Sequence, residues 1–505
     1  MASKLSEAEI LSSAAKLPTS TPLARCAMCL IALITSAVAF YFGTGLHPLW
    51  PFIWVAPIPL LITAPRVGRS AAFGIAFVAF AGGALNEWHY AQSLTQISVQ
   101  ILMLFLGVPS VAFALGILLY RRFVLRAMPL TAVLSLPSLW VAYEYTSALG
   151  SPHSTFGNLG YTQINFLAFI QLTSLTGIWG LSFFVFLFAS TVAVLLNPTF
   201  PIRARRNIAV VTVLLYLTIF SYGVWRLRNA YESSTVRVAL AASDTRDNLI
   251  ATKPQTSIAL FQRYAAQASA LAAQGAKIII LPEHTAIVTD DTGPNTARDV
   301  DALFASTAAA SQAFILIGVD RATASAHYNE SRLYAPTGGL VATYHKQHLL
   351  PPFENVFTPG TALTTYEQPS GLWGMAICKD MDFPKLSRQY GDKGVGLLLV
   401  PAWDFNEDGW LHGRMAILRG VESGFSIARS AKQGILTISD DRGRVLAQRE
   451  TTPTMPFVTL MADVPVRHTG TLYNRFGDWF ANLNLALFAC LLVVSLLPLR
   501  RRVLR

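Results

Sequence analysis

Long apolar runs separated by short polar segments dominate the first part of the chain. Seven of these runs are long enough to cross a bilayer, and an eighth follows near the C-terminus. The second contains four prolines and is the least regular, and the run from Asn165 is too long for one span, so we expect it to begin along the membrane interface. The eight runs lie at about 26–42, 46–64, 70–86, 98–120, 127–147, 176–197, 207–225 and 479–498.

The pattern changes at about Val236, where short β-rich runs alternate with helical segments and turns. Several of these runs are continuously apolar, as in strands that are buried on both faces. Helical spacing is found over Ser257–Ala273 and Leu411–Glu422. The predicted strands are Val236–Ser243, Ala276–Pro282, Phe314–Val319, Leu340–Tyr344, Trp373–Ile377 and Val395–Val400.

These patterns predict three parts. Residues 1–225 form an N-terminal α-helical membrane domain with about seven transmembrane helices. Residues 226–478 form a layered α/β domain large enough for a sizeable core. Residues 479–505 form a C-terminal transmembrane helix with a basic tail.

The basic residues predict the orientation of these parts. Charged residues make up only 13% of the 505 positions, and the net charge of +11 arises from clusters beside the apolar runs, which is typical of membrane topology and not of nucleic-acid binding. If all the clusters face the cytoplasm, eight crossings place residues 226–478 on the opposite side, the periplasmic side of a bacterial inner membrane. The clusters are Lys4, Lys16 and Arg25; Arg66 and Arg69; Arg121, Arg122 and Arg126; Arg203, Arg205 and Arg206; and Arg500, Arg501 and Arg502.

Three aromatic residues, Trp88, Tyr90 and Tyr161, fall on the same outer side as the α/β domain in this topology. Aromatic residues at such places are most often interfacial anchors. Contact with a lipid substrate is the alternative.

Four cysteines are too few and too unevenly placed for a disulfide framework. Cys26, Cys29 and Cys490 lie in apolar runs, where a thiol behaves as a small hydrophobic group. Cys378 is the only one outside such a run.

Three chemically active side chains follow apolar strands of the α/β domain. Glu283 follows Ile-Ile-Ile-Leu-Pro, Lys346 follows the strand that ends at Tyr344, and Cys378 follows Trp-Gly-Met-Ala-Ile. The segment from Asp380 to Leu386 is expected to begin a helix whose N-terminus favours the thiolate. Any one of these residues alone is more often structural or solvated. Together they supply a nucleophile, a proton carrier and an oxyanion-stabilising cation, the set that acyl transfer requires.

At these residues the chain resembles the nitrilase, or carbon–nitrogen hydrolase, superfamily. The matching motifs are Leu281-Pro282-Glu283, His345-Lys346 through Phe353-Glu354, and Ile377-Cys378 followed by Phe383-Pro384. The resemblance implies an αββα sandwich with a Glu-Lys-Cys triad.

Within that superfamily the layout is similar to the apolipoprotein N-acyltransferase family, which adds several N-terminal spans and one C-terminal span. Further matches are Gly160-Tyr161, Gly177–Gly180, His412–Arg429 and Tyr473–Asp478. The resemblance implies that Cys378 takes an acyl chain from a phospholipid as a thioester and passes it to the α-amine of a diacylglyceryl-cysteine lipoprotein. By the same resemblance, Glu283 is the general base, Lys346 holds the oxyanion and Glu354 orients the triad. The reaction it implies requires neither a metal nor a nucleotide. The resemblance implies no particular oligomeric state.

The residues after the nucleophile depart from the family pattern. Lys379-Asp380 stands where Tyr-Glu is usual, so the supporting carboxylate is kept in shorter form and the aromatic ring is replaced by a cation. Lys379 is expected either to act at the site, on the thiol pKa or on a donor phosphate, or to be a solvated lysine. The alternatives are a related acyltransferase with another amine acceptor, a membrane-bound amidase, and a degenerate scaffold.

Overall fold

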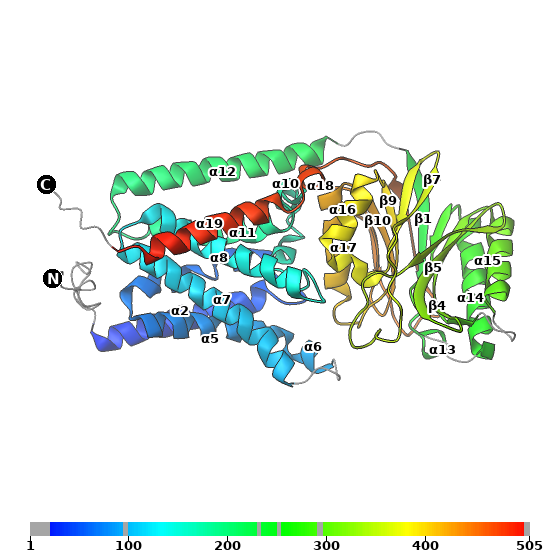
Figure 1. The fold of residues 1–505 in the computed structure, drawn as a ribbon, viewed down its shortest axis with the longest axis horizontal. Coiled ribbons are helices and arrows are strands. Elements are labelled where there is room, and N and C mark those ends of the chain that lie inside the picture. Colours follow the sequence, from blue (N-terminus) through cyan, green and yellow to red (C-terminus); the bar gives the residue numbers. More distant parts are fainter. Residues whose placement is uncertain (1–20, 94–98, 230–233, 250–253, 290–295, 499–505) are drawn as a thin grey trace.

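The computed structural model describes residues 21–93, 99–229, 234–249, 254–289 and 296–498. A helical bundle lies at one end of the molecule and a two-sheet domain at the other, with the bundle formed by residues from both ends of the chain (Figure 1). Its main helices are α2 (Pro22–Gly43), α5 (Arg69–Ala84), α7 (Val99–Leu125), α8 (Pro129–Gly150), α11 (Trp179–Leu195), α12 (Ile202–Arg228) and α19 (Trp479–Leu496).

Each predicted apolar run coincides with a helix or a pair of helices. The proline-rich run is not one uninterrupted span, because it is divided at Pro57 into α3 (Trp50–Val55) and α4 (Ile58–Thr63). The run from Asn165 is also broken: the short α9 (Leu167–Ile170) and α10 (Thr173–Thr176) meet α11 at 120°. Within the described residues, five helices, or six with this bent pair, are long and apolar enough to cross a membrane.

The basic cluster of Arg121, Arg122 and Arg126 lies at the end of α7 that is distant from the two sheets (Figure 1). Their guanidinium groups donate to backbone carbonyls at neighbouring helix ends, which joins the ends of α7, α4 and α19. The pairs are Arg121 with Ala64 (3.0 Å), Arg122 with Ser495 (2.6 Å) and Arg126 with Val494 (2.9 Å). Lys4, Lys16, Arg500, Arg501 and Arg502 lie outside the described residues.

Two mixed sheets form the second domain. The first, in spatial order, consists of β13 (Val458–Pro465), β1 (Thr235–Ala242), β2 (Ile278–Ile280), β4 (Phe314–Ala322), β5 (His327–Ala335) and β6 (Gly339–His345), with β3 (Ile287–Thr289) paired to β4. The second consists of β12 (Val445–Glu450), β11 (Ile435–Ser439), β10 (Ser426–Lys432), β9 (Leu397–Trp403), β8 (Gly371–Met375) and β7 (Thr364–Gln368). All six predicted strands are present.

Helices cover the outer faces of both sheets, which gives the expected αββα order. α14 (Pro254–Ala273) and α15 (Ala297–Ser311) cover the first sheet, while α16 (Pro384–Asp392) and α17 (Gly409–Ser423) lie between the second sheet and the bundle (Figure 1). Successive strand residues enter different cores because side chains alternate along a strand. Leu240 packs between the sheets, whereas Ala239 and Ala241 pack toward the outer helices.

The two domains share a packed joint. Leu418 and Val421 of α17 belong to the same buried cluster as Ile170 and Leu172 of the bundle. At the start of α19, the Asp478 carboxylate accepts hydrogen bonds from Trp179 of α11 (2.8 Å) and Tyr473 (2.9 Å). The joint therefore fixes the α/β domain against the helices.

Candidate active site

Glu283 and Lys346 meet at the ends of two strands of the first sheet. Glu283 follows β2 after Leu281 and Pro282, and Lys346 directly follows β6. The Lys346 ammonium donates to Glu283 Oε1 at 2.8 Å, and both side chains are buried. An ion pair buried in this way interacts strongly, because little water screens it.

Glu354 completes the charge pairing around Lys346. Its Oε2 lies 2.8 Å from the Lys346 ammonium, and the same oxygen accepts the Leu350 backbone N–H at 2.7 Å. Although burial raises the pKa of Glu354, the charges of Lys346 and His284 hold it well below its ordinary value. The predicted supporting residue therefore lies in direct contact with Lys346.

Cys378 faces this pair from the second sheet, at the turn after β8. Its thiol donates to the Trp403 carbonyl at 3.4 Å, and the preceding carbonyl, of Ala402, accepts the Glu283 N–H at 3.4 Å. Adjacent peptide groups at the end of β9 thus hold both residues. Cys378 adopts φ 43°, a left-handed conformation that costs a non-glycine residue free energy and that recurs at active sites.

Cys378 does not lie at the N-terminus of the predicted α-helix. The chain after Cys378 forms a 3₁₀ turn (Cys378–Asp382), and α16 begins only at Pro384. Burial and the charge of Glu283 raise the pKa of the Cys378 thiol well above its ordinary value, while Lys346 and Arg429 act in the opposite direction. A neutral resting thiol needs a base to remove its proton, and Glu283 is close enough to influence it.

Asp380 connects the turn at Cys378 to the segment after Lys346. One carboxylate oxygen accepts the Ile377 N–H at 3.0 Å and the Tyr344 hydroxyl at 2.7 Å. The other accepts the His348 N–H at 3.0 Å. The shorter carboxylate thus bridges the residues before Cys378 and after Lys346, a geometry suited to a supporting role.

Lys379 is buried, so the expectation of a solvated lysine is wrong. Its ammonium lies 3.3 Å from Asp382 and donates to His153 Nδ1 at 3.0 Å. His153 belongs to the loop after α8, and burial and the charge of Lys379 lower its pKa to about 4. Lys379 therefore connects the turn at Cys378 to the helical domain.

The three aromatic residues occupy different environments. Tyr161 is buried, and its hydroxyl contacts Thr155 at 2.7 Å and accepts from Arg419 of α17 at 3.1 Å, so it is not an exposed anchor. Tyr90, in α6 (Trp88–Ser93), donates to Asp408 at 2.7 Å. Trp88 is partly exposed at the start of α6.

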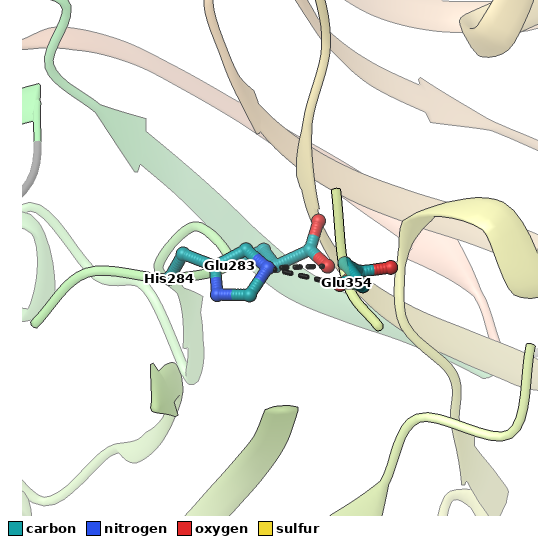
Figure 2. A group of neighbouring side chains, drawn as sticks. All are labelled: Glu283, His284 and Glu354. Carbon is teal, nitrogen blue, oxygen red and sulfur yellow. Dashed lines mark hydrogen bonds and ion pairs between the residues drawn. The ribbon is translucent and has the colours of Figure 1, made fainter. Parts of the chain in front are cut away.

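Two side chains at the centre of the site were not predicted from the sequence. Asn329 of β5 donates to Glu283 at 2.6 Å and to Glu354 at 2.7 Å. His284 turns its ring toward both carboxyl groups (Figure 2), with Nε2 3.0 Å from Glu354 and 3.5 Å from Glu283. The position of His284 directly after Glu283 was a usable signal, whereas nothing near Asn329 in the sequence marks it.

Glu283, His284 and Glu354 also have the spacing of a metal site, because their ligand atoms lie within 4.8 Å of one another. The Lys346 ammonium, however, already lies within hydrogen-bonding distance of both carboxylates. A metal ion would have to share this space with a buried cation. The chain's own lysine thus supplies the positive charge between the two glutamates.

Known proteins resemble this chain over both domains. Residues 29–191 match the apolipoprotein N-acyltransferase N-terminal domain, and residues 238–469 match the carbon–nitrogen hydrolase family. The apolipoprotein N-acyltransferase of Geobacter metallireducens is 28% identical, with 90% of this chain and 92% of the relative aligned. That of Vibrio vulnificus is 24% identical, with 86% of this chain and 90% of the relative aligned.

Among solved structures, an amidase from Nesterenkonia sp. superposes with a TM-score of 0.41 at 18% identity, covering 51% of this chain and 98% of the amidase. The two family matches together cover the bundle from α2 to most of α11 and nearly all of the two-sheet domain, in their observed order. The chain therefore belongs to the apolipoprotein N-acyltransferase family, within the nitrilase, or carbon–nitrogen hydrolase, superfamily.

Proposed function

We propose that this protein moves an acyl chain from a phospholipid to the α-amine of a diacylglyceryl-cysteine lipoprotein, through a thioester on Cys378. The observation that carries the proposal is the buried Glu283–Lys346 pair beside a thiol whose pKa is raised. A neutral thiol, a carboxylate to deprotonate it and a cation to receive developing charge form a working acyl-transfer unit.

In the first step Glu283 takes the thiol proton and the Cys378 sulfur attacks the ester carbonyl. The oxyanion that forms is stabilised by Lys346. The C–S bond forms, the ester C–O bond breaks, and Glu283 returns the proton to the departing lysophospholipid hydroxyl. In the second step the acceptor amine attacks the thioester and Glu283 takes the amine proton; the C–N bond forms, the C–S bond breaks, and Glu283 returns the proton to the Cys378 sulfur. Glu354 and Asp380 hold the reacting groups in place through the contacts described above.

The lipoprotein acceptor is the substrate named in the relatives. Mass spectrometry of lipoprotein N-termini tests it directly. Cells that lack this protein should accumulate diacylated lipoproteins, and the chain expressed in them should restore the third acyl group. Restored acylation of another amine would favour a related acyltransferase, whereas release of free fatty acid or ammonia without transfer would favour the hydrolase alternative.

The active site faces the periplasmic side of a bacterial inner membrane in this proposal, and the donor is an outer-leaflet phospholipid. The positions of Arg121, Arg122 and Arg126, at the end of the bundle away from the sheets, support this orientation. An alkaline phosphatase fusion near Ser370 should therefore be active, and a fluorescent-protein fusion at the same place should be dark. The opposite pair of results would overturn the topology.

Lys379 is expected to affect substrate choice, together with Trp88 and Tyr161. Lys379→Tyr removes the cation that binds Asp382 and His153, so the loop after α8 loses a tether close to the nucleophile. We expect Cys378 acylation to persist while the preference among donor head groups or acceptors changes. Competition assays with mixed phospholipids measure this preference. Lys385→Tyr, at an exposed lysine of α16, is the matched control, and identical preferences in both variants would argue against the role.

A further inference from the structure

His284 lies at a strained turn that brings it beside Glu283. Neighbouring residues in extended chain project to opposite sides. His284 instead adopts φ 49°, and this left-handed conformation allows both side chains to enter one cluster. Two hydrogen bonds hold the turn: the Thr285 N–H donates to the Gly318 carbonyl at 3.0 Å, and the Lys432 ammonium donates to the His284 carbonyl at 2.7 Å.

Both nitrogens of the His284 ring contact carboxylates. Nδ1 pairs with Asp320 of β4, and Nε2 lies 3.0 Å from Glu354 Oε1 and 3.5 Å from Glu283 Oε1. Asp320 thus anchors the ring through Nδ1, while Nε2 faces Glu283 and Glu354. A histidine anchored in this way can set the position of the carboxylates it faces.

The charges of the cluster explain why a histidine fits here. Two buried carboxylates, Glu283 and Glu354, share one ammonium, that of Lys346, and the partly exposed Asp320 adds a third negative charge on the far side of the His284 ring, so the cluster favours a second cation. Burial lowers the pKa of His284, but the charges of Asp320 and Glu283 outweigh burial and raise it to about 10. The carboxylates that contact both ring nitrogens thus favour the protonated imidazole near neutral pH. Lys432, whose pKa burial lowers to about 7 against the charges of Asp320 and Glu283, donates to the backbone carbonyls of Leu249 and His284 and makes no hydrogen bond to these carboxylates among the described residues.

We propose that His284 is a positioning residue of the acyl-transfer site: anchored by Asp320, its ring holds Glu283 and Glu354 on either side of Lys346 and supplies a second positive charge. The proposal rests on Glu283 acting as the base for Cys378. The His284 ring lies 5.9 Å, between ring centroids, from Trp403, whose carbonyl accepts the Cys378 thiol, and a positive charge near a thiol favours the thiolate. Loss of that cation should therefore raise the pH at which Cys378 becomes reactive.

The test is the rate of Cys378 alkylation by iodoacetamide as a function of pH, in full-length protein in detergent or nanodiscs with Cys26, Cys29 and Cys490 replaced by alanine. His284→Gln keeps hydrogen-bonding capacity but cannot be protonated. We expect its alkylation profile to shift upward by about one pH unit, so that the rate at fixed pH falls about tenfold. Asp320→Asn should shift the profile in the same direction by a smaller amount.

His327→Gln, at an exposed histidine of β5, is the matched control and should leave the profile unchanged. Unchanged alkylation in His284→Gln would overturn the proposal. So would a uniform loss of rate without a shift, because a purely structural role has that effect. Alkylation needs no acyl donor or acceptor, so this result is independent of whether the proposed substrates are correct.

Discussion

Cys378→Ala should abolish formation of the acyl-enzyme, with a loss of activity on the order of 10⁴-fold or more, because removing one member of a catalytic unit costs nearly as much as removing all of it. No other group at the site offers a thiol, since Cys26, Cys29 and Cys490 lie in helices of the bundle. Incubation of the full-length protein with phospholipid vesicles, followed by intact mass spectrometry, measures the adduct. Hydroxylamine should remove it, as expected of a thioester.

Cys490→Ala is the matched control, because this cysteine is exposed on α19. It should retain the adduct at the level of the unchanged protein. A hydroxylamine-sensitive adduct that persists in Cys378→Ala would show that the acyl chain is carried elsewhere. The triad would then have to be abandoned.

The candidate site could be predicted because its three principal residues follow apolar strands. Glu283 comes after β2, Lys346 after β6 and Cys378 shortly after β8. In each case the apolar run predicts the strand, and the chemically active residue follows where the strand ends. This relation is local in sequence. The contacts between those residues join opposite sheets and depend on the whole αββα arrangement.

Segments with a misleading pattern were not predicted. β5 reads as polar because it contains Asn329, Glu330 and Arg332, yet all three are buried. Arg332 is paired with Glu330 of the same strand at 2.5 Å and with Asp301 of α15 at 2.7 Å, and these two carboxylates make its burial possible. β12 was not predicted for a different reason: the strand is largely exposed, so its sequence contains no apolar run.

Lys379 and His284 show the same limit at the site. Lys379 pairs with Asp382 and His153, and His284 pairs with Asp320. Such pairings are invisible in a single sequence. An isolated lysine is best interpreted as solvated until its partners are known.

Lys346→Met should have the second-largest effect, on both activity and stability. The substitution keeps the length of the side chain but leaves Glu283 and Glu354 buried without the ammonium between them. Removing one partner of a buried ion pair costs about 3–5 kcal/mol, because the remaining charge is uncompensated. Lys346 also opposes the rise in the pKa of the Cys378 thiol, so its loss makes the nucleophile harder to deprotonate.

The loss of stability in Lys346→Met should depend on pH in a defined direction. Without the ammonium, the His284 ring is left to balance two buried carboxylates, so burial and the charge of Glu283 raise the folded-state pKa of Glu354 above the unfolded value of roughly 4.3. A group with a raised folded pKa stabilises the fold below its unfolded pKa and loses this contribution as pH rises through the folded pKa. The difference in apparent Tm from the unchanged protein should therefore be largest near pH 8 and shrink toward pH 5. In the double variant Lys346→Met/Glu354→Gln, one of the two opposed carboxylates is also removed. It should recover much of the stability at pH 8 without recovering activity. Equal Tm values for the single and double variants would refute the charge-pairing argument.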